Sequence, residues 1–440
     1  MRHHRNLFLL FIIFLLSFSI FLSAAGEKKE KKQKEEQPPR ISLPIPDSRT
    51  LLKKEDPSYK DLAFFLRSLA IIKNAYVDEK KVSQRELLKK ALRGLLRELD
   101  PYSAYESPEE AKVNRERTSG NFAGIGVTVR SRGAAVEVLT VFEGSPAEKA
   151  NMRSGDLIAE VNGEAVSGYD LDGCVKKIKG EAGTTVKLKL FRRDTPKPLT
   201  VSIRRGIVKI SPIVNAVTLE PGIGYVRISS FTERTQEDLL QALKKFPEGK
   251  YHSLIIDLRN NPGGLLDAAI GASSIFLPTG REVVSTAGRL PSSRRTFTAR
   301  ETPKRLDLSL VILINGGSAS AAEIMAGCLR DHNRAILAGT KSFGKGSVQT
   351  VLPLGEKDGA MRLTTARYLT PSRKMIHGIG ITPDIIAPIS PALHLKLSAG
   401  LLSRTLKEGA VFNSFAREDI QLMRAKEILR SLQILKKKKN

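Results

Sequence analysis

The chain has 440 residues, 41% of them hydrophobic, which is a globular composition and long enough for two or three domains. Its formal net charge of +26 favours anionic partners, but the basic residues are scattered and no Trp is present for base stacking, so we expect no nucleic-acid partner. Only two cysteines are present, Cys174 and Cys328, which excludes a disulfide framework and a cysteine-based metal cluster.

Residues 1–25 have the pattern of a secretory signal. Basic Arg2 and Arg5 precede an apolar run, which is followed by small residues. An uncleaved membrane anchor is the alternative, because the run is near the lower limit of about 17 residues for spanning a bilayer. Either way, the positive charges before the run predict that the rest of the chain is extracytoplasmic, in the periplasm or cell envelope. Residues 26–56 mix charges with prolines and are expected to form a solvated linker.

Residues 57–117 are expected to form a small helical domain. Two stretches, SYKDLAFFLRSLAIIKNAYVD and SQRELLKKALRGLLRELD, place apolar residues at helical spacing. Ser83, with Glu86 three residues later, predicts the start of the second helix. Asp100 and Pro101, in the stretch LDPYSAY, predict its end.

Residues 118–205 change to short runs rich in Val, Ile and Leu, which predict a compact β-rich unit. The loop GIGV is followed by SPAEKANMRSGDLIAEVNG, and together they resemble a PDZ domain rather than an unrelated β-sandwich. The resemblance implies that the loop's backbone amides hold the terminal carboxylate of a peptide, which adds to the unit as a further strand. The implied peptide-binding residues are Gly124, Ile125, Gly126 and Val127.

Residues 206–390 alternate strand patterns with helix patterns. Uniformly apolar strands followed by helices predict an α/β core with a mostly parallel sheet covered on both faces. Functional groups of such sheets lie beyond the carboxyl ends of the strands. Two of these ends carry glycine-rich turns, NPGG and GGS. The site is therefore expected there.

Ser320 lies in NGGSASAAE, where a predicted buried strand turns into a helix. At such a turn a hydroxyl can be held out of the sheet beside backbone amides and a helix N-terminus, which suits a nucleophile next to an oxyanion site. The alternative is that Ser318 or Ser320 only caps the helix.

A base for this serine is needed, and only His332 and His377 are conceivable histidine partners. A neutral lysine can replace histidine, provided that it is desolvated. Lys345 lies in FGKGSVQT, whose glycines allow close backbone approach and whose Phe343 and Val348 are expected to exclude water. A solvated loop lysine is the alternative. GTKSFGKGS also nearly matches a phosphate-binding loop, but glycine occupies the place of the magnesium-binding hydroxyl, and we reject an ATPase.

Ser320, with Lys345 twenty-five residues later and Gln349 four beyond it, resembles the carboxyl-terminal processing proteases, which are secreted Ser-Lys peptidases with a PDZ domain. The resemblance covers nearly everything after the linker, including LDPYSAY, LRNNPGG, GIGITPDI and the C-terminal DIQLMRAKEIL. It implies a crotonase-like core, protein substrates with accessible C-terminal tails, and no cofactor or metal.

The resemblance also assigns residue roles. Ser320 is the implied nucleophile and Lys345 its general base. Gln349 is expected to orient the lysine, and its even separation from Lys345 places both on one face of an extended strand. The implied oxyanion donors are the amide of Ala321 and one amide from Gly263 or Gly264, between which the sequence does not choose. Asp331, proposed as catalytic in some relatives, is interpreted as structural.

The helical end segments, 57–117 and 391–440, carry apolar stripes, and by resemblance they pair subunits into a homodimer. Two other functions remain possible from the sequence: a non-catalytic PDZ scaffold that binds tails of envelope proteins, and a different acyl-transfer enzyme on a similar sheet. The Ser–Lys spacing disfavours the first, and the PDZ-like unit disfavours the second.

Overall fold

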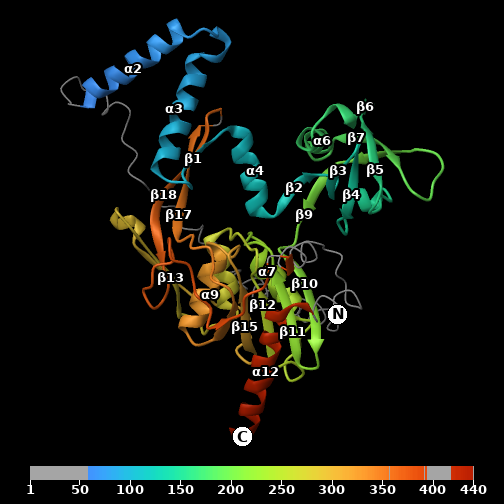
Figure 1. Cartoon of the computed structure of the whole chain (residues 1–440), viewed down its shortest axis with the longest axis vertical. Helices are drawn as coiled ribbons and strands as arrows, with labels where there is room; N and C mark the ends of the chain where they lie inside the picture. The colour runs from blue at the N-terminus through green and yellow to red at the C-terminus, as the bar shows by residue number, and fades with distance from the viewer. Residues whose placement is uncertain (1–57, 356, 391, 394–417, 440) are drawn as a thin grey trace, which may run out of the picture. The chain divides into compact units, whose positions relative to one another are not determined.

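The computed structural model describes residues 58–439, apart from residues 356, 391 and 394–417 (Figure 1). The predicted signal or anchor (1–25) and the linker (26–56) lie outside the described residues. Among the helices that are described, none combines the length and the apolar character that a bilayer span requires.

The helices predicted near the N-terminus are confirmed. The Oγ of Ser83 accepts a hydrogen bond from the amide of Glu86 at 3.4 Å, which caps α3. This helix ends before Asp100, whose carboxylate accepts the amides of Tyr102 and Ser103 at 2.8 and 2.9 Å. The elements of this part are α2 (Ser58–Ala75), α3 (Gln84–Leu99), β1 (Ala104–Glu106) and α4 (Pro108–Ser119).

A β-rich unit with its own hydrophobic core follows, as predicted for the PDZ-like region. Its main sheet has the order β3-β4-β5-β7-β8, with the short β6 paired to β5, so β3 is an edge strand. The chain enters and leaves the unit through an antiparallel pair, β2 and β9. The strands are β2 (Asn121–Gly124), β3 (Val127–Arg132), β4 (Ala135–Val141), β5 (Leu157–Val161), β6 (Glu164–Ala165), β7 (Thr185–Phe191), β8 (Leu199–Arg204) and β9 (Gly206–Lys209). The helices are α5 (Pro146–Lys149) and α6 (Leu171–Ile178).

The sheet that carries the predicted site has the order β10-β11-β12-β15-β16-β19 (Figure 1). Strands β10 and β11 are antiparallel, and the other four pairs are parallel. Helices α7, α8 and α9 cover one face, and α12 covers the other, which explains the uniformly apolar strands. The strands are β10 (Ile213–Glu220), β11 (Ile223–Ile228), β12 (Ser253–Asp257), β15 (Ser309–Ile314), β16 (Ala335–Gly339) and β19 (Ile385–Ile386). The helices are α7 (Thr235–Leu243), α8 (Leu266–Ser274), α9 (Ala321–Asp331) and α12 (Ile420–Lys439).

A second, antiparallel sheet of five strands was not predicted. Its order is β1-β18-β13-β14, with β17 also paired to β18, and it joins the LDPYSAY region to the segment that follows Lys345. The core is therefore mixed, and a mostly parallel arrangement describes only the first sheet. The additional strands are β13 (Glu282–Gly288), β14 (Arg295–Thr298), β17 (Ser347–Gly355) and β18 (Gly359–Leu369).

The C-terminal helix α12 packs on the chain's own sheet. Its Leu422, Ala425 and Leu429 are buried in one cluster with Tyr225 and Val311 of β11 and β15. The expectation that this apolar stripe is available to a partner subunit is wrong for this part of the helix, because it supplies the second cover of the sheet.

Candidate active site

Ser320 lies at the start of α9, and its backbone has an unusual conformation. Its φ of 55° and ψ of −116° fall in a region that side-chain-bearing residues rarely adopt, with a typical cost of about 1–3 kcal/mol. Two hydrogen bonds from backbone amides hold the turn: the amide of Ala319 donates to the carbonyl of Asn261 at 2.9 Å, and the amide of Ser320 donates to Glu323 Oε2 at 2.8 Å. Ser320 also occupies the N-cap position, so the nucleophile and capping interpretations concern the same place.

The turn before Ser320 is fixed by the neighbouring Ser318. Its Oγ donates to the carbonyl of Leu258 at 2.8 Å and accepts the amide of Asn315 at 2.9 Å. Ser318 is fully buried, and its hydroxyl is therefore used to join two loops. Ser318 and Ser320 therefore have different surroundings, although they are only two residues apart.

Glu323 connects the predicted nucleophile to the predicted base. Its buried carboxylate accepts four hydrogen bonds, and the donors are Ser320 N (2.8 Å), Lys345 N (2.9 Å), Gly344 N (2.7 Å) and Ser342 Oγ (2.5 Å). Burial raises the pKa of this carboxyl, and the four donors act in the opposite direction. Sequence reasoning missed this residue, although the Ser-x-x-Glu spacing of a capping box was present.

Lys345 is half-buried, and its Nζ lies 4.8 Å from the centre of the Tyr102 ring. Burial lowers the pKa of Lys345 first, and the positive charges of Arg362 and Arg117 lower it further. Among the described residues, no hydrogen bond joins this Nζ to Ser320. The burial of this side chain acts on its pKa in the direction that a lysine base requires.

The glycines beside Lys345 do allow close packing. A Cβ on Gly346 would lie 2.3 Å from the amide nitrogen of His377, and Gly344 has a φ of 90°. The expected cover by Phe343 is at most partial, because this residue is 59% exposed. Val348 is buried as expected, and Tyr102 supplies the aromatic contact instead.

Gln349 is not bonded to the amine of Lys345 in this structure. Its Nε2 donates to Ser347 Oγ at 2.8 Å and lies 3.4 Å from Thr364 Oγ1. The pairing of β17 with β18 shifts in register where Val348 and Gln349 face Ala366 and Thr364, so the extra residue, Thr365, lies on β18. The orienting role of Gln349 stays a prediction.

The two candidate glycines of the oxyanion site differ in their bonding. A Cβ on Gly263 would lie 2.8 Å from Ser320 Cβ and 2.9 Å from the amide nitrogen of Ala321, so this glycine packs directly on the start of α9. Its own amide already donates to Asn261 Oδ1 at 2.8 Å. Among the described residues, the amides of Gly264 and Ala321 have no hydrogen-bond acceptor, and Gly264 is exposed.

The histidines occupy other places. His332 follows α9 at the end opposite Ser320, about 18 Å away at 1.5 Å per residue, and its Nε2 lies 2.6 Å from the carbonyl of Glu282. Asp331 accepts the amide and the hydroxyl of Ser372 at 3.0 and 2.7 Å, which fits its structural interpretation. His377 lies beside Lys345 instead, in the wall of a cavity of about 560 Å³. The cavity is lined by Leu99, Asp100, Pro101, Tyr102, Phe343, Gly344, Ser347, Thr364, Arg367, His377 and Gly378.

The predicted carboxylate-binding loop precedes the edge strand β3. Gly126 has a φ of 86°, and a Cβ there would lie 2.4 Å from Ser145 Cβ, so the tight packing requires glycine. The carbonyl of Ile125 accepts the amide of Ala147 at 2.8 Å. No acceptor for the amides of Ile125 and Gly126 is found in the described part of the chain. Gly124 ends β2, and Val127 begins β3.

Comparison with known proteins decides the family. Residues 222–387 match the model of peptidase family S41, and residues 123–203 match that of the PDZ domain. The chain is 44% identical over 339 residues to the carboxy-terminal-processing protease of Bartonella bacilliformis, covering 76% of each chain. The chain belongs to the carboxyl-terminal processing protease family. This family membership makes it a serine-type peptidase, as the sequence predicted.

The chain is similar to further proteins. Carboxy-terminal processing protease CtpB of Bacillus subtilis is 34% identical over 322 residues, which are 72% of this chain and 66% of CtpB. A solved structure of the photosystem II D1 C-terminal processing protease is 30% identical, with a TM-score of 0.43, and the match covers 74% of this chain and 93% of that one.

The site of this protease also depends on asparagines that sequence reasoning treated only as turn residues. Asn260 and Asn315 exchange hydrogen bonds, each 2.9 Å long, between the two glycine-rich turns. Asn261 holds both the amide of Gly263 and, through its carbonyl, that of Ala319. Three asparagines in LRNNPGG and NGGS were the available signal, because buried Asn side chains commonly replace backbone partners in turns.

Proposed function

We propose that this protease is an extracytoplasmic endopeptidase that cleaves the C-terminal region of protein substrates by a Ser-Lys mechanism. The observation that carries the proposal is the shared carboxylate of Glu323, which holds the backbones of both Ser320 and Lys345. The strained backbone of Ser320 and the lowered pKa of Lys345 support the two roles independently.

In the proposed reaction, the neutral Nζ of Lys345 accepts the proton of Ser320 Oγ as this oxygen attacks the scissile carbonyl carbon. The carbonyl oxygen becomes an oxyanion. The amine of the leaving segment then takes the proton from Lys345 as the C–N bond breaks. The same lysine then deprotonates a water molecule as it attacks the acyl carbon, and Ser320 Oγ takes the proton back from Lys345 when the ester bond breaks. The scheme requires no cofactor.

The oxyanion is proposed to accept hydrogen bonds from the amides of Ala321 and Gly264. Gly264 is preferred to Gly263 because the amide of Gly263 already donates to Asn261. The amide of Ala321 belongs to the first residue of α9, where the helix dipole adds favourable potential for an anion. Gly263 is left with a packing role against Ser320.

Gln349 is proposed to orient the amine of Lys345 during the reaction. Its side-chain amide bonds Ser347 in this structure, so the proposed role requires the Gln349 side chain to rotate from that partner. Its two partners, Ser347 and Thr364, both line the cavity beside Tyr102.

The PDZ unit is proposed to hold the tail of the substrate. The amides of Ile125 and Gly126 are available for a carboxylate, with Gly124 and Val127 forming the ends of the loop, and β3 offers an unpaired edge for strand addition. We further propose the division of the chain at 117/118, 205/206 and 390/391, and a crotonase-like arrangement of the core. Secretion or anchoring through residues 1–25 completes the proposal.

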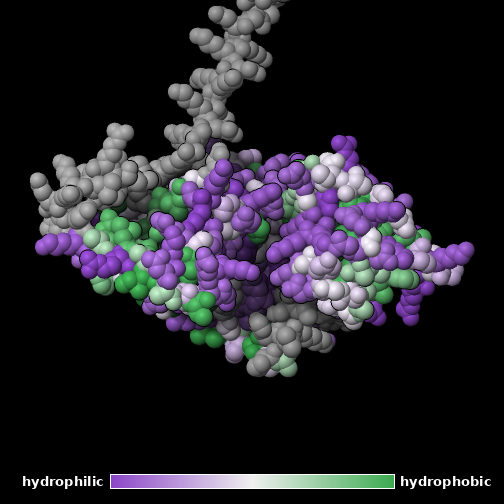
Figure 2. Space-filling model, turned by 90° about the horizontal axis from the view of Figure 1, so that it is seen from above, coloured by the Kyte–Doolittle hydropathy of each residue, from purple (hydrophilic) through white to green (hydrophobic). Residues whose placement is uncertain are grey.

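A homodimer is proposed through the N-terminal helices. Large apolar side chains of this region are exposed, among them Phe64 at 73% and Val77 at 95%. Hydrophobic residues form separate patches on an otherwise mostly hydrophilic face in Figure 2. Exposed apolar side chains of this size on α2 favour burial against a second copy.

Hydrolysis of an unstructured protein by purified variants tests the mechanism. Ser320→Ala and Lys345→Arg should each reduce cleavage to background while peptide binding remains, because a guanidinium is not a base near neutral pH. Undiminished cleavage by either variant would reject the Ser-Lys mechanism. Binding without cleavage by the parent protein would indicate a scaffold instead.

A second experiment tests tail recognition. Amidating the C-terminus of a peptide substrate removes the charge and leaves the scissile region intact. We expect hydrolysis to slow by about tenfold, as expected for loss of hydrogen bonds to a charged group worth about 1.5 kcal/mol or more. Equal rates for the acid and the amide would reject tail recognition and leave the mechanism of cleavage unaffected.

A further inference from the structure

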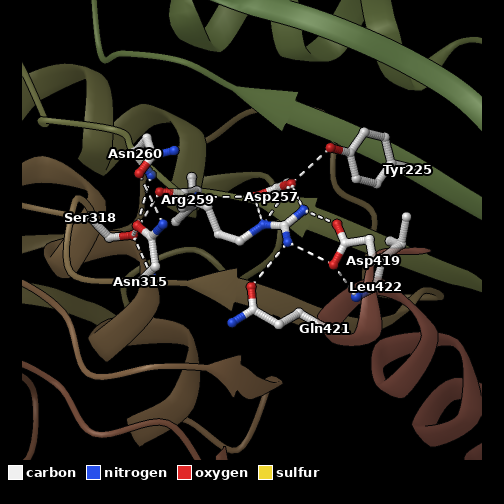
Figure 3. A network of polar contacts seen from close by, with 10 residues as sticks. Tyr225, Asp257, Arg259, Asn260, Asn315, Ser318, Asp419, Gln421 and Leu422 are labelled. Carbon is white, nitrogen blue, oxygen red and sulfur yellow. Dashed lines mark hydrogen bonds and ion pairs between the residues drawn. The ribbon is translucent and has the colours of Figure 1, made fainter. Parts of the chain in front are cut away.

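A buried ionic cluster joins the C-terminal segment to the loop that enters the active site (Figure 3). Arg259, two residues after β12, is buried with Asp257 and with Asp419, the residue before α12. Its Nη2 lies 2.6 Å from Asp257 Oδ2 and 2.7 Å from Asp419 Oδ2, and its Nη1 donates to Asp419 Oδ1 at 3.0 Å. The guanidinium thus pairs with two carboxylates, and one of them, that of Asp419, belongs to the C-terminal segment.

Neutral partners complete this cluster. Tyr225 donates its hydroxyl to Asp257 at 2.8 Å. Gln421 accepts Nη1 of Arg259 at 3.0 Å, and its own amide donates to the carbonyl of Ala387 at 2.7 Å. Polar groups at this depth are costly unless they are paired, so the cluster has little freedom to shift.

Arg259 begins the loop that ends at Gly263 and Gly264. The amide of Asn260 donates to Asn315 Oδ1, and the carbonyl of Leu258 accepts the hydroxyl of Ser318. Figure 3 shows Asn260, Asn315 and Ser318 beside Arg259. A displacement of Arg259 is therefore transmitted to both glycine-rich turns, one carrying Gly264 and the other leading to Ser320.

We propose that Asp419 is a positioning residue for peptide hydrolysis: through Arg259 it fixes the 260–264 loop against Ser320. The inference rests on the proposed role of Gly264 as an oxyanion donor. The C-terminal segment thereby belongs to the catalytic apparatus of this protease, although it lies outside the family match at residues 222–387.

The structure offers a variant that separates this role from helix capping. Asp419 Oδ1 also accepts the amide of Leu422 at 3.1 Å and so caps α12. Asn caps helices about as well as Asp. Asp419→Asn therefore keeps the cap and the side-chain shape, and removes the negative charge that Arg259 contacts.

A matched control removes another contact of α12 with the sheet. Glu220, at the end of β10, binds Lys426 at 2.9 Å and Arg430 at 2.6 Å. Glu220→Gln loosens α12 there without touching Arg259. If α12 contributes only stability, the two variants should behave alike.

The test compares kcat and KM of the full chain for one peptide, together with the Ki of a peptide aldehyde of the same sequence. The aldehyde forms a tetrahedral adduct with a serine nucleophile, and therefore reports the oxyanion donors. We expect Asp419→Asn to lower kcat at least tenfold, to raise the aldehyde Ki by a similar factor and to leave KM within twofold. Losing one oxyanion donor costs about 100-fold or more, and a displaced donor should cost part of that. Glu220→Gln should leave all three values within twofold.

Equal effects of Asp419→Asn and Glu220→Gln on kcat, or an unchanged aldehyde Ki in Asp419→Asn, would overturn the proposal. Gln421→Met serves if Asp419→Asn does not fold, since it keeps every charge and removes one bond to Arg259. It should lower kcat and weaken the aldehyde in parallel by about threefold, and no change in either would equally overturn the proposal. If the parent hydrolyses the peptide and the Ser320→Ala variant keeps this activity, the proposed nucleophile is disproved instead.

Discussion

Replacing Glu323 by Gln should disconnect Ser320 from Lys345 while changing almost no volume. The carboxylate accepts four hydrogen bonds, and Gln has one oxygen to accept them. The other atom becomes an NH₂ donor: in the place of Oε2 it faces the amides of Ser320 and Lys345, and in the place of Oε1 it faces the amide of Gly344 and the hydroxyl of Ser342. Two bonds to a charged acceptor are lost, at about 1.5–3 kcal/mol each, which sums to about 3–6 kcal/mol.

Part of this loss is offset, because Gln does not bury a charge, and burial already disfavours the charged form of Glu323 by raising its pKa. We therefore expect a net loss of about 3 kcal/mol in the free energy of unfolding. A shift of about 1 Å between nucleophile and base can cost on the order of 100-fold in rate, so kcat should fall by about that factor.

Urea unfolding and steady-state peptide hydrolysis measure the two effects of Glu323→Gln. Glu137→Gln is the matched control, since Glu137 is a buried carboxylate that pairs with Arg130 and Arg132 in the PDZ unit. The control should change kcat less than twofold. A Glu323→Gln enzyme with kcat within twofold of the parent, and with parental stability, would refute the linking role of this carboxylate.

The titration of Lys345, the backbone strain of Ser320 and the proposed dimer can each be tested. Because burial and Arg362 lower the pKa of Lys345, kcat/KM should rise with pH as the amine loses its proton, and it should level off below pH 10.5. Arg362→Gln should move this rise to higher pH, and an unmoved profile would contradict the assignment of Lys345 as the base. Ser320→Gly should abolish hydrolysis, and its free energy of unfolding should be about 1 kcal/mol higher than that of Ser320→Ala. Glycine relieves backbone strain of about 1–3 kcal/mol, and its greater flexibility costs about 0.5–1 kcal/mol; equal free energies of unfolding for the two variants would argue against strain. Ile71→Asp, on the exposed face of α2, should convert the proposed dimer to a monomer in sedimentation velocity, and a monomeric parent at micromolar concentration would reject the dimer.

The strand and helix order of the core could be predicted from the sequence because it depends on local patterns. Strands such as β12 and β15 are buried on both faces, so every residue in them is constrained, and the pattern is visible in a short window. The turn at Ser320 was visible for the same reason, since it follows such a strand directly.

The missing parts depend on contacts between distant segments. Arg259 and Asp419 are 160 positions apart, and neither neighbourhood indicates the other. Strand β1 pairs with β18 across an even longer stretch of the chain, which brings Tyr102 to Lys345. The register shift opposite Gln349 arises in the pairing of β17 with β18, and the pattern of one strand alone does not reveal it. The packing of α12 on the sheet was missed because an apolar stripe does not say which surface covers it.

The strained backbone of Ser320 requires partners from several segments at once. Isolated, the turn would relax, because the cost of about 1–3 kcal/mol exceeds what one neutral hydrogen bond contributes, about 0.5–1.5 kcal/mol. In the folded chain, Asn261 holds Ala319 on one side, and Glu323 holds the Ser320 amide on the other. Both supports are themselves fixed, the first by the loop that Arg259 begins and the second by the segment that carries Lys345. The nucleophile's conformation is therefore a property of the assembled core, and a change at any of these supports should reach Ser320 before it unfolds the domain.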